Sequence, residues 1–149
     1  MAFKEWALIC NALEDGSQSV IFRKGGIAEG RDGFRFRHEA FYLFPTFFHT
    51  QKEKTTFPES VPLPEADPDW ITLRLHARVE WTALLTDWEA ITRLEPFHFW
   101  TAATLAERFT YDEPPGIHLA VVRVYRLETP WRFPNAPKYG GCRSWVAVP

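Results

Sequence analysis

A short basic turn is the feature of this sequence best suited to chemistry. Arg23 and Lys24 follow the apolar run 20–22, and Gly25 and Gly26 come next. Two glycines let the backbone point its N–H groups at an anion, and the two cations add positive charge. Phosphate is the natural ligand, although the G-x-x-x-x-G-K-[ST] spacing of a P-loop is missing. The turn therefore predicts a phosphate contact; the plainer interpretation is a glycine hairpin with surface charges.

A second basic surface is predicted where arginines alternate with aromatic residues. Residues 34–37 read Phe-Arg-Phe-Arg, and Arg74 and Arg78 lie on the polar side of a later alternating segment. Such interleaving is typical of surfaces for single-stranded nucleic acid, because rings stack on bases while cations follow the phosphates. The alternative is an ordinary strand with one solvated basic face and one buried aromatic face.

Further residues are candidates for a pocket that holds a base. Two histidines offer hydrogen bonds to a base edge, three aromatic residues offer stacking, and an arginine adds charge. The candidates are His49, His98, Trp100, Arg108, Tyr139 and Trp145. A different interpretation makes His49, His98 and Arg108 the centre of a small hydrolase, provided that they share one hydrogen-bonded network.

Few sequence patterns indicate any other kind of catalytic site. The five histidines form no H-x-x-x-H or H-E-x-x-H pair, and no G-x-S-x-G elbow is present. Asp69 precedes a strand, as the first acid of a restriction-type nuclease would, but no Glu-x-Lys follows. Cys142 beside Arg143 could be an activated thiolate, yet a small structural residue is the simpler interpretation. We assign no catalytic residue and expect no metal and no other cofactor.

Composition favours one globular domain over residues 1–149. The chain is 46% hydrophobic and 16% aromatic, which is enough for a core at this length. Its net charge of −2 argues against a protein that coats DNA by bulk charge, although a local basic cleft remains compatible with it. The excess of aromatic residues also suits a homo-oligomer or partner interface.

The cysteines and the N-terminus indicate a cytoplasmic protein. Cys10 and Cys142 form no C-x-x-C pair, so two free thiols in a reducing compartment are the simplest interpretation, with a bridge left open until geometry decides. Charged residues stand where the apolar part of a signal peptide would lie. No apolar run approaches the roughly 20 residues of a membrane span.

Residue periodicity predicts about six strands and three or four short helices. The predicted helices are 3–13, 46–54 with Thr46 as N-cap, 87–94 and 101–109, and the predicted strands are 20–22, 34–37, 40–44, 71–81, 117–127 and 144–148. An acidic, proline-rich loop is expected over 57–69, and a further loop from Pro130 onward. Without regular βαβ spacing, this predicts an α+β fold with a mixed, mostly antiparallel sheet or a small β-barrel.

Several segments, taken together and in order, resemble the bacterial family catalogued as "domain of unknown function 1802". They are residues 4–6, 22–27, 43–46 with His49, 98–101, 108–109, 123–127 and 139–145. The resemblance covers nearly the whole chain and implies no established activity. Some members are joined to a restriction-endonuclease-like domain, which implies a role in restriction or defence against foreign DNA, with nuclease chemistry supplied by a partner protein.

The order of elements is also similar to that of PUA-like barrels, including the ASCH and EVE domains. Those domains commonly bind RNA or modified bases in a cleft, which implies DNA or RNA as the partner here. The leading hypothesis is therefore a non-catalytic nucleic-acid recognition module that reads a base or modified base. The competing hypotheses are a small hydrolase acting on a nucleotide or nucleic acid, and a protein-interaction domain.

Overall fold

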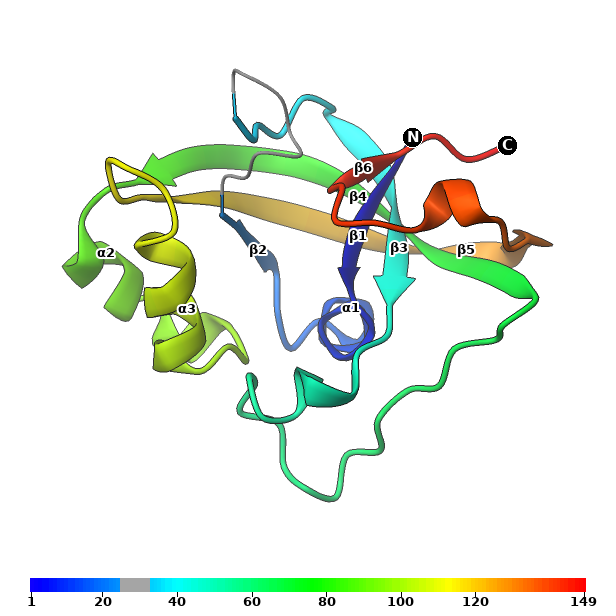
Figure 1. The fold of residues 1–149 in the computed structure, drawn as a ribbon, viewed down its shortest axis with the longest axis horizontal. Helices are drawn as coiled ribbons and strands as arrows, with labels where there is room; N and C mark the ends of the chain where they lie inside the picture. The colour runs from blue at the N-terminus through cyan, green and yellow to red at the C-terminus, as the bar shows by residue number, and fades with distance from the viewer. Residues whose placement is uncertain (25–32) are drawn as a thin grey trace.

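The sheet of this protein joins strands that lie far apart in the sequence. The computed structural model describes residues 1–24 and 33–149, and in these residues six strands form one sheet in the order β2-β5-β4-β3-β1-β6 (Figure 1). Among the described strands β1 and β3 run parallel, and the other neighbours run antiparallel. The strands are β1 (Ala2–Trp6), β2 (Val20–Arg23), β3 (Ala40–Thr46), β4 (Trp70–Leu85), β5 (Ile117–Pro134) and β6 (Trp145–Val146). The predicted α+β fold with a mixed, mostly antiparallel sheet is confirmed.

The helices are short and begin or end at the residues that favour such positions. Gly16 ends the first helix in the left-handed conformation, at φ 81°. Asp87 and Thr101 begin the next two, because their side chains accept backbone N–H groups at the first turn. The helices are α1 (Ala7–Asp15), α2 (Trp88–Thr92) and α3 (Ala102–Phe109), with 3-10 turns η2 (His49–Gln51), η3 (Glu95–Phe97) and η4 (Pro137–Tyr139). No helix in the described residues is long and apolar enough to span a membrane.

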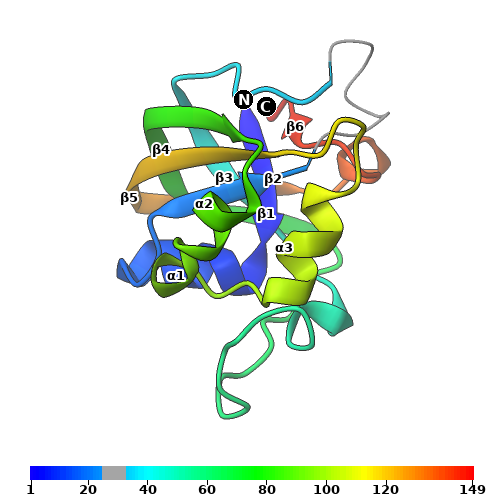
Figure 2. The ribbon, with the colours of Figure 1, turned by 90° about the vertical axis from the view of Figure 1, so that its left-hand side faces the viewer.

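The sheet curls until its two edges approach each other (Figure 2). Arg23 at the end of β2 donates from Nε to the Ser144 hydroxyl just before β6, at 2.8 Å. A second, longer bond joins Arg23 Nη1 to the carbonyl of Lys4 in β1, at 3.5 Å. Side chains thus join these edges, while no backbone ladder between β2 and either β1 or β6 is found in the described residues. The result is a barrel-like sheet that stays open along one line.

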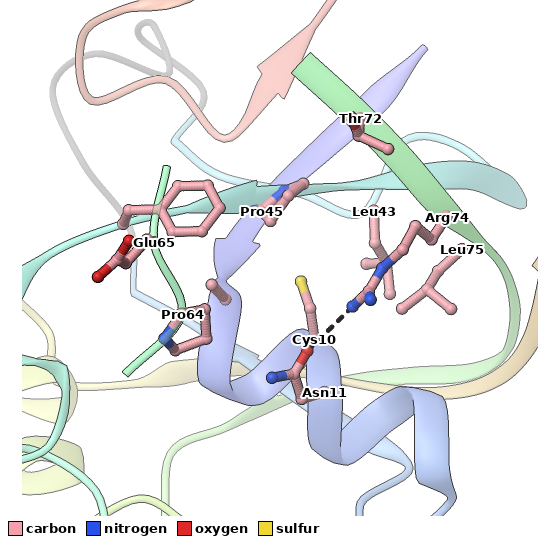
Figure 3. Close-up of a pocket in the computed structure, with 11 residues that line it drawn as sticks. Cys10, Asn11, Leu43, Pro45, Pro64, Glu65, Thr72, Arg74 and Leu75 are labelled. Atoms are coloured by element: carbon pink, nitrogen blue, oxygen red, sulfur yellow. Dashed lines mark hydrogen bonds between the residues drawn. The ribbon is translucent and has the colours of Figure 1, made fainter. Parts of the chain in front are cut away.

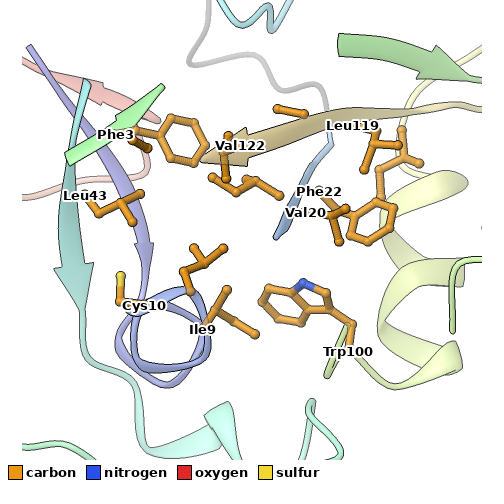
Figure 4. Packing of buried hydrophobic residues seen from close by; sticks show 14 of the residues in the cluster. Phe3, Ile9, Cys10, Val20, Phe22, Leu43, Trp100, Leu119 and Val122 are labelled. Carbon is orange, nitrogen blue, oxygen red and sulfur yellow. The ribbon is translucent and has the colours of Figure 1, made fainter. Parts of the chain in front are cut away.

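Two hydrophobic clusters cover the two faces of β1. The larger lies between the sheet, α1 and the segment that leads into α3, and it includes Phe3, Ile9, Phe22 and Trp100 (Figure 4). The smaller lies on the opposite face of β1 and β3, where the C-terminal part of the chain folds over them. Its buried members are Ala2, Phe44, Leu73, Phe133, Tyr139 and Val146.

The predicted helix over 3–13 is wrong at its start. Ala2–Trp6 is strand β1, paired with β3 and β6, and α1 begins only at Ala7. Phe3, Trp6 and Cys10 match the helical period, but pairing in the sheet overrides that local preference. Because both faces of β1 are covered, the strand also lacks the alternation that would reveal it.

Two further local predictions are wrong. Residues 34–37 form no strand, although their alternating burial is present: Phe34 is buried and both arginines are exposed. Thr46 caps no helix, because it is the last residue of β3 and donates its hydroxyl to the Glu5 carbonyl at 3.1 Å. Only the 3-10 turn η2 follows it.

Irregularities in the β4–β5 pair account for two further differences. Between Val79 and Trp81 the register shifts by one residue, and at this irregularity Trp81 is 55% exposed instead of buried. A second shift, opposite Leu73 and Leu75, lets β5 pass Pro130 and pair again as far as Pro134. Proline is tolerated at such a bulge because no ladder hydrogen bond is required there. The loop expected from Pro130 onward therefore begins only after Pro134.

Candidate functional site

Strand β1 places a carboxyl group inside the protein. Phe3 and Glu5 point into the larger cluster, and Glu5 is 1% exposed. Its Oε1 accepts the backbone N–H of Trp6 at 2.7 Å. Its Oε2 is buried and has no hydrogen-bond partner in residues 1–24 and 33–149. A buried carboxylate oxygen without a partner is costly, so Glu5 is a candidate for contact with a ligand.

The charge state of Glu5 depends on its surroundings. Burial raises the pKa of the Glu5 carboxyl, and the nearby guanidinium groups of Arg23 and Arg108 oppose that rise. Because burial outweighs the two cations, the folded protein holds the Glu5 proton more tightly than an exposed glutamate does.

Arg108 of α3 places a cation near enough to this carboxyl to lower its pKa. Its guanidinium carbon lies 3.8 Å from the ring centroid of Trp100 and 5.4 Å from that of Trp6. Its Nη1 donates to the Phe22 carbonyl on β2, at 3.4 Å. Burial lowers the pKa of Arg108 to about 10, and Glu5 partly counters this. Arg108 therefore remains charged at neutral pH and joins α3 to both sides of the open line of the sheet.

We give the name seam to the residues that connect β2, the end of β1 and α3 through these contacts: Glu5, Trp6, Arg23, Trp100 and Arg108. Arg23 is half-buried, and its guanidinium carbon lies 5.2 Å from the ring centroid of Phe3. Lys24 follows directly, with Nζ 3.7 Å from the ring centroid of Tyr111. Burial lowers the pKa of Lys24, with Glu107 acting against it. Half-buried cations thus stand on the more exposed side of the seam, which we call its entrance.

A second unpaired polar group lies deeper in the seam. Trp100 is 2% exposed, and its Nε1–H has no acceptor in the described part of the chain. The indole meets Trp6 edge to face at 4.7 Å between centroids, and its nitrogen points into the core (Figure 4). The seam therefore holds one unpaired acceptor, on Glu5, and one unpaired donor, on Trp100, behind a basic entrance.

The structure brings together some of the residues that the sequence predicts for a site. Arg23, Trp100 and Arg108 share the seam, and Lys24 stands beside it. Gly25 and Gly26 lie outside the described residues. His98 lies behind Trp100, where its Nδ1 accepts the Trp100 backbone N–H at 3.0 Å and its ring meets Phe22.

The other predicted pocket residues lie elsewhere. His49 is exposed in η2, and Tyr139 belongs to the smaller cluster on the opposite face of β1. Trp145 packs edge-on against Phe3, and its Nε1 donates to the Arg35 carbonyl at 3.2 Å. Within residues 1–24 and 33–149 no network joins His49, His98 and Arg108, which the hydrolase hypothesis requires.

Two residues of the site, Glu5 and Ser144, are not predicted from the chemistry of their side chains. Ser144 is 2% exposed and accepts the hydrogen bond from Arg23. Both lie in segments that resemble the family, and that resemblance is the signal in the sequence that points to them. Their neighbour Lys4 points to the opposite face, where Nζ donates to the carbonyls of Gly140 and Gly141 at 3.2 and 2.9 Å.

Comparison with known proteins defines the family. The family model described as "Domain of unknown function (DUF1802)" matches residues 2–149. The chain belongs to this family. Among curated proteins no sequence matches it.

Two solved structures share the fold of this DUF1802 chain. Both are mutants of ZmASCH from Zymomonas mobilis, with TM-scores of 0.51 and 0.50 and sequence identities of 13% and 14%. Each match covers 82% of this chain and only about two thirds of ZmASCH, 66% and 67%. The likeness confirms the ASCH-type, PUA-like fold that the order of elements predicts, and at these identities it shows the fold alone.

No metal centre is formed by the described residues of this DUF1802 chain. In residues 1–24 and 33–149 no three side chains of His, Cys, Asp and Glu gather as metal ligands would.

The two cysteines differ in accessibility and should differ in reactivity. Both are free thiols; Cys142 is exposed, whereas Cys10 is buried beside a cavity of about 300 Å³ (Figure 3). Burial raises the pKa of the Cys10 thiol well above its usual range. We expect about one thiol per chain to react with a disulfide reagent in the native protein, and both to react after unfolding. A Cys142→Ser variant should show no native reaction; reaction of that variant would mean that Cys10 is accessible.

Proposed function

We propose that this chain is a non-catalytic nucleic-acid recognition module that binds a nucleotide at the seam. A phosphate would meet Arg23 and Lys24 at the entrance, and a base would meet the Glu5 carboxyl and the Trp100 indole behind them. One observation carries the proposal: an unpaired buried acceptor and an unpaired buried donor, on Glu5 and Trp100, lie behind a basic entrance.

The basic entrance supplies affinity that depends on salt. The net charge of the chain is −2, but Arg23, Lys24 and Arg108 concentrate positive charge at one place. Phosphate contacts from such cations position a nucleic acid without reading its sequence, and they weaken as salt rises.

The buried pair supplies selectivity for the base. Glu5 Oε2 can accept from an amino or imino N–H group, and Trp100 Nε1 can donate to a carbonyl oxygen. Guanine and uracil present an N–H group directly beside a carbonyl, and cytosine presents an amino group and a carbonyl on either side of N3, whereas adenine has no carbonyl. A base that fails to pair these groups leaves them unpaired in the interior, which is a strong basis for rejection.

The family resemblance suggests where this function would be used. The proposal includes a cytoplasmic role in restriction or defence. In that role the module recognises DNA or RNA, including modified bases, and a partner nuclease supplies the cleavage. The arrangement of the sheet supports the proposal, because the seam residues gather along the line where the sheet of this chain stays open.

Binding of short labelled oligonucleotides tests the proposal. We expect single-stranded cytosine or uracil 12-mers to bind at about 50 mM salt more tightly than adenine 12-mers, by roughly tenfold. Lys24→Ala should weaken binding roughly tenfold and reduce the slope of log K against log salt by about one. Fluorescence anisotropy with RNA and DNA probes, plain and cytosine-methylated, measures all of these.

The control variant is Arg123→Ala, which removes one positive charge from a strand position paired with Glu80 at 3.4 Å. It should bind like the unmodified chain. Absence of binding by every probe at low salt, or an equal loss with Arg123→Ala, would contradict the proposal.

A further inference from the structure

A large groove lies on the side of β1 opposite Glu5. It has a volume of about 890 Å³ and runs between the end of β3, the segment 65–72 and the segment 135–142. It shares a wall with the cavity beside Cys10: Pro45, Phe47, Glu65 and Thr72 line both (Figure 3). The two hollows therefore form one elongated depression, a shape suited to an extended chain more than to a compact ligand.

Exposed aromatic side chains line this depression. Trp70 is 39% exposed, Phe47 37% and Phe48 51%, and all three border the groove. Single exposed aromatic residues are normal, but several around one hollow mark a surface that a partner covers. Aromatic residues are also the usual anchors of protein interfaces.

Contacts within the chain hold Trp70 in place at the edge of the groove. Arg132 places its guanidinium carbon 4.5 Å from the Trp70 ring centroid and pairs with Asp67 at 3.2 Å. Asp67 in turn accepts the backbone N–H groups of Asp69 and Trp70, at 3.0 and 3.1 Å. Because this edge is ordered before binding, a partner loses less free energy in ordering it.

An acidic segment forms one rim of the groove, and its Glu65 and Asp67 line the groove itself. The segment 57–69 contains four acidic residues and no basic one: Glu59, Glu65, Asp67 and Asp69. Glu59 and Asp67 have basic partners, but in the described part of the chain Glu65 and Asp69 form no ion pair. Lys4 on the groove wall is already bonded to the Gly140 and Gly141 carbonyls. Such a rim repels phosphate and attracts a cationic side chain.

We propose that this acidic groove, defined by Phe47, Glu65, Trp70 and Tyr139, docks an extended segment of a partner protein that carries Lys or Arg between apolar residues. The apolar residues would lie against Trp70 and Phe47, and the cation would meet Glu65, which lines the groove. Extended segments bound in aromatic grooves are a recurring mode of peptide recognition. The surface is separate from the seam, so the two proposals succeed or fail independently.

Selection of peptides by the full chain tests the groove directly. We expect a displayed library of random 12-residue peptides to yield sequences with a basic residue flanked by apolar or proline residues. A selected peptide, made synthetically, should bind Trp70→Ala roughly 10- to 30-fold more weakly and Glu65→Lys roughly tenfold more weakly, as measured by calorimetry. Trp81→Ala removes a tryptophan that is more exposed than Trp70, at 55% against 39%, and lies outside the groove, so this variant should bind like the unmodified chain.

Any other outcome would contradict the proposal that the groove docks a basic, apolar peptide. Failure to enrich any sequence, selection of acidic peptides, or equal binding by Trp70→Ala and Trp81→Ala would overturn the proposal. Loss of oligonucleotide binding in Trp70→Ala with the fold intact would overturn it too, because the groove would then belong to a nucleic-acid surface. Circular dichroism of each variant shows whether the fold is intact.

Discussion

Replacement of Arg108 by alanine should lower the free energy of unfolding by about 2–4 kcal/mol, a large part of the stability of a domain of this size. Arg108 stacks on Trp100 at 3.8 Å and bonds to the Phe22 carbonyl, so its removal leaves a gap between α3, β1 and β2. The same change removes one of the two cations that offset the buried Glu5 carboxyl. Lost packing and lost charge compensation therefore act together. Denaturation in urea, followed by tryptophan fluorescence, measures the change.

Companion variants separate these two causes. Arg108→Met keeps much of the side-chain volume without the charge, so it should lose less stability than the alanine variant. Adding Glu5→Gln to Arg108→Met should recover part of the remaining loss, because the buried carboxyl then no longer needs a cation. Arg93→Ala on α2, whose partner is exposed, should change stability by less than about 0.5 kcal/mol. Unfolding of Arg108→Ala at the same urea concentration as the unmodified chain would show that Arg108 does not hold the seam together.

The elements that the sequence predicts well are those with a local signal. The alternating segment of β4 and the capped helix after Thr101 carry their pattern within a few residues, and both are confirmed. Strand β1 has no such pattern, because both of its faces are buried and its polar residues Lys4 and Glu5 point inward on opposite sides. A strand of this kind is recognisable only from its neighbours in the sheet.

The residues of the seam can be predicted from the sequence only in part, because only some of them have a local signal. Trp100 and Arg108 belong to one stretch of chain and stand out as a large aromatic residue and a cation near a helix. Glu5 and Ser144 join them only through contacts between opposite ends of the chain, such as the bond from Arg23 to Ser144 across 121 positions. The curl of the sheet creates that contact, and bulges such as the one near Trp81 contribute to curl without leaving a local pattern.

Replacement of Glu5 by glutamine should stabilise the protein at neutral pH, by on the order of 1 kcal/mol, and weaken recognition of the base. Burial raises the pKa of the Glu5 carboxyl, because the charged form costs free energy in the interior of the folded chain. Glutamine has nearly the same shape and stays neutral, which removes the cost of burying a charge. A residue whose replacement improves stability is expected at a binding site, where function opposes stability.

The pH dependence of this gain follows from the direction of the pKa shift. The folded chain holds the Glu5 proton more tightly than the unfolded chain, so Glu5 favours folding most below its ordinary pKa of about 4.3. That contribution is lost as pH rises from there through the raised pKa of the folded state. The glutamine variant should therefore match the unmodified chain near pH 4 and become more stable as pH rises, reaching a constant difference at higher pH. Thermal unfolding at several pH values measures the difference.

Binding measurements on the same variant separate the base contact from the phosphate contact. Glu5→Gln should bind its preferred oligonucleotide roughly tenfold more weakly, because an amide cannot reproduce a carboxylate acceptor, while the dependence on salt stays unchanged. Lys24→Ala should do the reverse, with a smaller salt slope and an unchanged preference among bases. The two variants therefore test opposite ends of one bound nucleotide. If Glu5→Gln gains stability yet keeps full affinity and base preference, the unpaired Glu5 oxygen serves no ligand, and the proposed base contact in the seam is wrong.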